Sequence, residues 1–133
     1  AADLFLDTWP CNAHTPASEA VWAGVPVLTV PGPTFASRVA ASLVAACGLA
    51  DLACRSEDDY VELATALANE PATLQGLKAH LDVNRRALPL FDAERLARDM
   101  DALFVRMHER RLAGLPPQAL AAAPLCSCIA SRW

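Results

Sequence analysis

The chain has 133 residues, of which 54% are hydrophobic and 20% are charged, and this composition is typical of a compact globular domain. Its length sets a limit of one domain. The formal net charge of −4 argues against a nucleic-acid-binding surface, since such domains carry a basic stripe. No stretch reaches the ~20 apolar residues that a membrane span needs. Neither a nucleic acid nor a membrane is therefore an expected partner.

Five cysteines, an odd number, fit neither a paired disulfide framework nor a zinc finger. Cys11, Cys47 and Cys54 are scattered, and a single residue separates Cys126 from Cys128. Reduced thiols and a cytoplasmic location are predicted. The chain starts without Met and without a signal-like segment, and we interpret it as part of a longer protein.

The first predicted elements are a strand, a helix and a second strand. The apolar run Leu4–Thr8 predicts a strand, and a helix is expected over Pro16–Ala23, with Thr15 as its N-cap and Gly24 at its C-terminal stop. A second buried strand is predicted over residues 26–30. This order in so few residues predicts a parallel pair.

A second helix is predicted after Thr34, its N-cap, and is expected to end before Gly48, with Phe35 on its buried face. Both helix N-termini then lie at one edge of the sheet, where open α/β folds bind ligands. The first amides of a helix lack internal partners, and the helix dipole is positive there. The sequence therefore predicts a phosphate site at the start of the first helix.

The rest of the chain is predicted to be helical. A helix begins after Ser56, another near Pro71, and a long one after the cap Asp92, ending around Gly114. The residues beyond it read as a flexible tail. The apolar residues of the long helix repeat at helical spacing and are predicted to be buried: Leu96, Met100, Leu103, Phe104 and Met107.

The runs Cys11–Glu19, Val21–Gly32 and Phe35–Ser42 resemble the C-terminal lobe of O-linked N-acetylglucosamine transferases. The resemblance continues more weakly to about residue 117. It implies a GT-B architecture, in which two Rossmann-like lobes hold UDP-N-acetylglucosamine in a cleft. It also implies inverting transfer of the sugar to Ser or Thr of proteins, with no metal and no other cofactor required.

The expected fold class is therefore α/β, the distal part of a Rossmann-like GT-B C-terminal lobe, with two parallel strands followed mostly by helices. Residues 1–115 are assigned to this lobe and residues 116–133 to the tail. Upstream, the resemblance implies the N-terminal lobe and, in some members, tetratricopeptide repeats. The implied partners are the nucleotide-sugar donor and a protein or peptide acceptor.

The resemblance assigns UDP binding to His14, Thr15, Pro16 and Glu19. The family pattern resembles N-G-H-T-T-x-x-D, and Ala13, Pro16 and Glu19 depart from it here. Pro16 removes a hydroxyl and an amide, so phosphate contact is expected to rest more on the amides that follow it, those of residues 17 and 18. Glu19 keeps a carboxylate that can accept from the ribose hydroxyls.

Two further residues are assigned by resemblance. Cys11 is expected at the sugar end of the cleft as a packing residue, and Arg38 as a second-loop contact, although Pro33 replaces a Glu that the family often has there. Catalysis by Cys11 with His14 is a poor alternative, because nothing else nearby would lower the thiol pKa. No residue is assigned as a general base, which the other lobe supplies in the family, and no metal spacing occurs.

Two alternatives stay open at this point. A degenerate lobe that has lost donor binding through Pro16 and Pro33 would act as a helical protein-interaction module. A GT-B transferase for another nucleotide sugar would use the same ribose carboxylate and the same amide-bound diphosphate.

Overall fold

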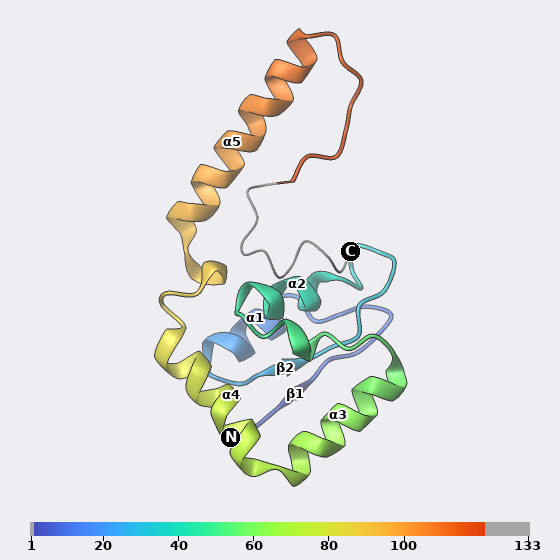
Figure 1. Cartoon of the computed structure of the whole chain (residues 1–133), viewed down its shortest axis with the longest axis vertical. Helices are drawn as coiled ribbons and strands as arrows, with labels where there is room; N and C mark the ends of the chain where they lie inside the picture. The colour runs from blue at the N-terminus through green and yellow to red at the C-terminus, as the bar shows by residue number, and fades with distance from the viewer. Residues whose placement is uncertain (1, 122–133) are drawn as a thin grey trace. The chain divides into compact units, whose positions relative to one another are not determined.

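The structure is a computed structural model that describes residues 2–121. It divides into two compact units, one ending at Phe91 and one starting at Asp92 (Figure 1). The predicted tail lies in part outside the described residues, as do Cys126 and Cys128, and the boundary at residue 115 stays a prediction.

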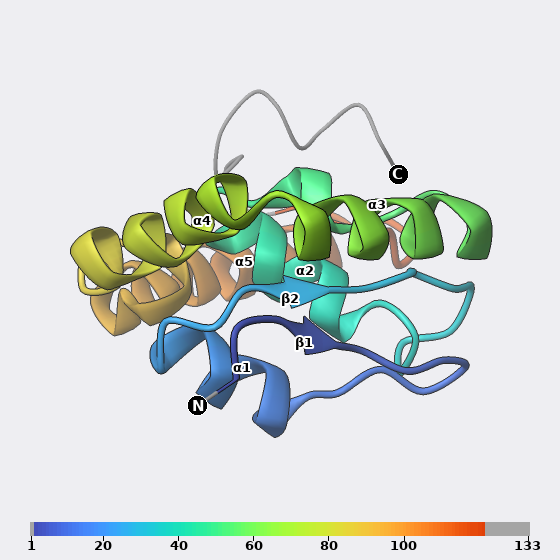
Figure 2. The ribbon, with the colours of Figure 1, turned by 90° about the horizontal axis from the view of Figure 1, so that it is seen from below.

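The first unit is built on a pair of parallel strands, β1 (Phe5–Leu6) and β2 (Val27–Leu28), in which Phe5 pairs with Val27. The helix α1 (Thr15–Trp22) connects them, so the predicted strand–helix–strand unit is confirmed. Figure 2 shows α1 on one side of the strand pair and α3 and α4 on the other.

A third chain segment reaches the strand pair, which the sequence did not predict. Thr29, just after β2, forms an isolated parallel bridge with Ala53. The amide of Thr29 donates to Leu52 O at 3.0 Å, and the amide of Cys54 donates to Thr29 O at 2.8 Å. The segment after the short 3-10 helix η1 (Ala50–Leu52) thereby continues the parallel order.

The helix α2 (Val39–Ala46) starts later than predicted, with Arg38 as its N-cap. Thr34 is not the cap, because it forms a tight turn with Ser37 in which the Ser37 hydroxyl donates to Thr34 O at 3.0 Å. The prediction that Phe35 is buried is also wrong, since its side chain is 76% exposed. A residue in the turn does not share the face of the helix that follows.

Two longer helices complete the first unit. α3 (Glu57–Asn69) is capped as predicted, since the Ser56 hydroxyl accepts from Asp59 N, and α4 (Pro71–Asn84) begins at its proline. A short 3-10 helix, η2 (Pro89–Phe91), follows. The fully buried side chains form one core between strands and helices, and the largest of them include Val21, Val27, Leu28, Val44 and Leu81.

The second unit contains α5 (Ala93–Leu112), capped by Asp92, whose side chain accepts from Arg95 N. The predicted burial of its apolar stripe is wrong: no residue of α5 is buried, and Leu96 is 60% exposed. Helical spacing reveals an apolar face, but burial also needs a surface to cover it. No described helix is both long enough and apolar enough to span a membrane.

Candidate functional site

The start of α1 differs by one residue from the prediction. His14 is the N-cap, Thr15 is the first helical residue and Pro16 the second. No side chain caps the helix, so the prediction that Thr15 caps it is wrong. The Thr15 hydroxyl is therefore not engaged in capping.

This shift changes which amides a ligand could reach. The amide of Ser18 already donates to His14 O at 3.1 Å, as the first bond of the helix. Pro16 has no N–H, and Ala17 is fully buried. This geometry does not favour phosphate contact through the amides of Ala17 and Ser18, and that expectation stays a prediction. The exposed residues His14 and Thr15 are the ones left to offer amides.

The loop before α1 and the loop before α2 lie against each other, as the sequence predicts. The amide of Asn12 donates to Ala36 O at 2.9 Å, and His14 Nε2 lies 3.4 Å from the same oxygen. The rings of His14 and Phe35 meet edge to face, with centroids 6.0 Å apart. One carbonyl thus connects the two loops, and an exposed aromatic ring stands beside the N-cap histidine.

The second loop is held by short-range contacts. The hydroxyls of Thr34 and Ser37 lie 2.9 Å apart, and the amide of Thr34 donates to the Ser37 hydroxyl at 3.0 Å. A Cβ on Gly32 would lie 2.7 Å from the same hydroxyl, so only glycine fits there without displacing Ser37. Phe35 therefore lies in a turn that these hydrogen bonds stabilise.

Beneath the two loops lies a buried polar group that the sequence reasoning missed. Asp7 is 3% exposed, and its carboxylate accepts from the amide of Ala13 at 2.7 Å and from the Thr29 hydroxyl at 2.6 Å. The available signal was an acid at the end of an apolar strand pattern. Asn12, 4% exposed, donates through Nδ2 to Thr8 O at 3.0 Å, while its Oδ1 has no hydrogen-bond partner among residues 2–121.

The remaining assigned residues lie on the surface. Glu19 is exposed on α1, just beyond its first turn. Cys11 is exposed in the loop before α1. Arg38 is exposed, and within residues 2–121 its side chain makes no hydrogen bond or ion pair. The structure thus brings the rings of His14 and Phe35 together, next to Thr15. Arg38 contacts Phe35 only through its main chain, where its amide donates to Phe35 O at 3.1 Å.

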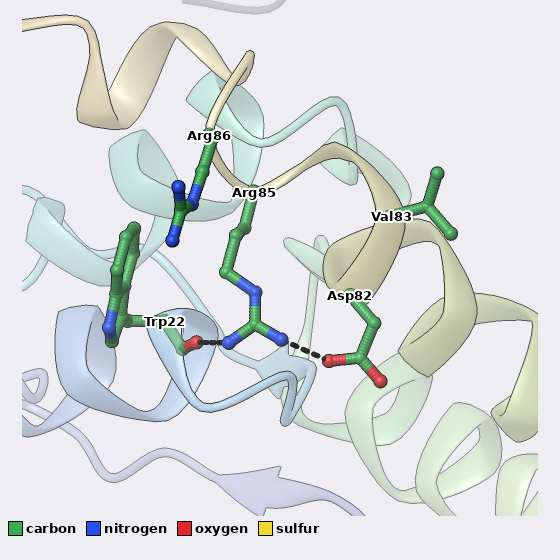
Figure 3. Close-up of a pocket in the computed structure, with 5 residues that line it drawn as sticks. All are labelled: Trp22, Asp82, Val83, Arg85 and Arg86. Carbon is green, nitrogen blue, oxygen red and sulfur yellow. Dashed lines mark hydrogen bonds and ion pairs between the residues drawn. The ribbon is translucent and has the colours of Figure 1, made fainter.

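A cavity of about 430 Å³ lies at the opposite end of α1 (Figure 3). Arg85 donates through Nη1 to Trp22 O at 2.7 Å and through Nη2 to Asp82 Oδ1 at 2.8 Å. The Arg85 side chain therefore connects the end of α1 to the end of α4. Because the contacts of Arg85 join α1 and α4, we interpret the cavity as a gap in the packing between these two helices and not as a ligand site.

Two of the cysteines, Cys47 and Cys54, are buried, and their thiols are expected to be unreactive. Burial raises the pKa of the Cys47 thiol to about 12, and burial together with the nearby Asp59 carboxylate raises that of Cys54. A raised pKa keeps a thiol protonated and unreactive at neutral pH. Within the described part of the chain, no group of three or more His, Cys, Asp or Glu residues is arranged to hold a metal ion.

Parallel strands joined by a helix, with the next helix starting at the same edge, define part of a Rossmann-like lobe. A family model described as Glycosyl transferase family 41 matches residues 1–100. The chain belongs to this family of glycosyltransferases. Its fold matches part of the GT-B lobe of a solved bacterial relative, a variant of the Thermobaculum terrenum O-GlcNAc transferase, with a TM-score of 0.73 and 33% identity over 79% of this chain and 20% of that one.

Curated relatives agree with this assignment. The chain is 38% identical over 88% of its length to the probable UDP-N-acetylglucosamine–peptide N-acetylglucosaminyltransferase SEC of Arabidopsis thaliana. It is 35% identical over 86% of its length to the UDP-N-acetylglucosamine–peptide N-acetylglucosaminyltransferase of Caenorhabditis elegans. The chain spans 12% and 10% of these two relatives.

Proposed function

We propose that this chain forms the donor-binding part of an inverting protein O-N-acetylglucosaminyltransferase, with UDP-N-acetylglucosamine as the donor and Ser or Thr of a protein as the acceptor. The single observation that carries the proposal is the uncapped start of α1, where His14 and Thr15 are exposed at the carboxyl end of β1. A helix N-terminus without a side-chain cap offers amides and a positive dipole end to a diphosphate.

In this proposal each residue has a defined task. His14 donates an imidazole N–H to a phosphate oxygen, and Thr15 supplies its amide and hydroxyl. Glu19 accepts from the ribose hydroxyls, and Cys11 packs against the sugar. The developing negative charge on the departing UDP is stabilised by these donors, which is a large contribution to transfer chemistry.

The acceptor hydroxyl needs a general base, and the resemblance of this chain to its family implies that the other lobe supplies that group. We therefore expect this chain alone to transfer no sugar. Sugar transfer by the isolated chain, above a heat-inactivated control, would contradict that division of labour. We also propose that the reaction requires no metal, that the other lobe lies upstream, and that the protein is cytoplasmic.

The proposal is tested by calorimetric titration of UDP into the intact natural protein and its Glu19→Gln variant. We expect the variant to weaken UDP binding about 5- to 100-fold, because the ribose hydroxyls lose a charged acceptor. Glu62→Gln, which removes the same charge at an exposed position of α3, is the matched control and should bind UDP normally. Unchanged affinity in Glu19→Gln would remove the assigned role of this carboxylate.

One observation favours the rival, a degenerate lobe that serves as an interaction module. Pro16 has no N–H and Ala17 is buried, so fewer donors face a phosphate than a helix start normally offers. An intact protein that binds neither UDP nor UDP-N-acetylglucosamine at millimolar concentration would favour this rival. Preference for a different nucleotide sugar would instead indicate another GT-B transferase.

A further inference from the structure

The Asp7 carboxylate lies buried next to the loop that leads into α1. It is 3% exposed, and no ion pair to it occurs among residues 2–121. A buried carboxylate costs free energy unless hydrogen bonds compensate it. Two short ones do so here, from the Ala13 amide at 2.7 Å and from the Thr29 hydroxyl at 2.6 Å.

We propose that Asp7 is a positioning residue for donor binding. Ala13 directly precedes the N-cap His14, so a fixed Ala13 amide fixes the peptide from which His14 and Thr15 extend. This inference rests on the proposed function, since it concerns the same site. It adds that the diphosphate contact depends on a buried residue that touches no ligand.

The geometry explains why a carboxylate suits this place. Asp7 directly follows β1, and Thr29 directly follows β2. One carboxylate oxygen of Asp7 accepts from the loop amide of Ala13 and the other from the Thr29 hydroxyl, so these bonds fix the loop relative to both strands. Hydrogen bonds to a charged acceptor are shorter and stronger than neutral ones. Asn12 holds the same loop from other sides, through Thr8 O and Ala36 O. The loop is thus held at successive residues.

A second hydrogen bond to Asp7 allows a positioning role of its carboxylate to be distinguished from a contribution to stability alone. The Tyr60 hydroxyl donates to the main-chain oxygen of Asp7 at 3.0 Å. This bond connects α3 to the same residue but does not involve its carboxylate. Tyr60→Phe is therefore a matched control, which should lower the midpoint of thermal unfolding and leave the ratio of UDP to uridine affinity unchanged.

The experiment measures UDP and uridine affinities of the intact protein by calorimetry. We expect Asp7→Leu, similar in size but with no acceptor, to weaken UDP about tenfold and uridine less than about twofold, because only UDP uses the diphosphate site. Asp7→Asn should restore UDP affinity to within about twofold of the natural protein, since its amide can accept from Ala13 and donate to Thr29.

Thr29→Val is the second loss variant, in case Asp7→Leu does not fold, because it removes one of the two bonds and keeps the side-chain shape. It should weaken UDP about threefold and leave uridine unchanged. Equal effects on both ligands, or none, in the folded loss variants would overturn the positioning role. A natural protein that binds no UDP would instead overturn the proposed function on which this inference rests.

Discussion

The imidazole of His14 and the carbonyl of Ala36 lie 3.4 Å apart, measured from Nε2 to the oxygen. These residues belong to different loops, one before α1 and one before α2. The contact orients the His14 ring, and the rings of His14 and Phe35 pack edge to face at an interplanar angle of 88°. Because a carbonyl oxygen only accepts, Nε2 carries a proton in this contact, and Nδ1 can donate to a phosphate only when both ring nitrogens are protonated.

His14 is therefore predicted to contribute to phosphate binding. We expect His14→Ala in the intact protein to weaken UDP binding about tenfold and to leave uridine within about twofold, because one charge-assisted bond is lost. Calorimetric titration with both ligands measures this difference. His108→Ala, on exposed α5, is the matched control. The same loss for uridine as for UDP would show that His14 contacts no phosphate.

Gly24 and Gly76 are predicted to respond in opposite directions to the same substitution. Gly24 has a φ of +80°, and a Cβ there would lie 2.5 Å from Asp82 Oδ1, which Arg85 holds. Gly24→Ala should lower the free energy of unfolding by about 1–3 kcal/mol. Gly76 lies in α4 with nothing within 4 Å of a Cβ, so Gly76→Ala should raise it by about 0.5–1 kcal/mol. Urea unfolding measures both, and equal signs would contradict the geometry.

Thiol accessibility tests the placement of Cys11. In a background with Cys126→Ser and Cys128→Ser, a thiol reagent should label Cys11 in the folded 133-residue chain, and Cys47 and Cys54 only after unfolding. In the intact protein, UDP-N-acetylglucosamine should slow the labelling of Cys11 more than UDP does, because the sugar is expected to cover this thiol. Equal protection by both ligands would place Cys11 away from the sugar.

The stability of the chain is predicted to fall at alkaline pH. Burial raises the pKa of Cys47 from the ordinary value of 9.0 to about 12. Between these values the unfolded chain loses a proton that the folded chain keeps, so the free energy of unfolding decreases as pH rises. Burial, and then the Asp7 charge, also raise the pKa of Tyr60. Urea unfolding at pH 8 and 10 should show a smaller decrease for Cys47→Ala, and identical decreases would contradict this account.

Local chemistry made several elements predictable from sequence. Ser56 followed by acids marked the start of α3, Pro71 marked that of α4, and Asp92 that of α5, because capping and first-turn preferences depend on neighbouring residues. The parallel strand pair followed from its apolar runs. The bridge from Thr29 to Ala53 could not be predicted, since it depends on tertiary packing of a segment without a strand pattern.

The proximity of the loops before α1 and α2 was predictable from the sequence, but the details of each loop were not. Sequence reasoning placed Thr15 as the cap, yet no side chain caps α1, and the helix begins at Thr15 itself. It placed Phe35 inside a helix, whereas the hydroxyls of Thr34 and Ser37 stabilise a turn there. The role of Asp7 depends on hydrogen bonds to Ala13 and Thr29. Such tertiary hydrogen bonds cannot be predicted from the composition or from the spacing of residues in the sequence.

The most direct test of a diphosphate site at the start of α1 is Pro16→Thr in the intact protein, titrated with UDP and with uridine. The substitution restores an amide at the second position of α1 and adds a hydroxyl, and both can reach only the phosphates. UDP affinity should rise about 3- to 10-fold with uridine unchanged. Pro71→Thr, the same exchange at the start of α4, should change neither ligand. An equal change for UDP and uridine in Pro16→Thr, or none, would contradict the account.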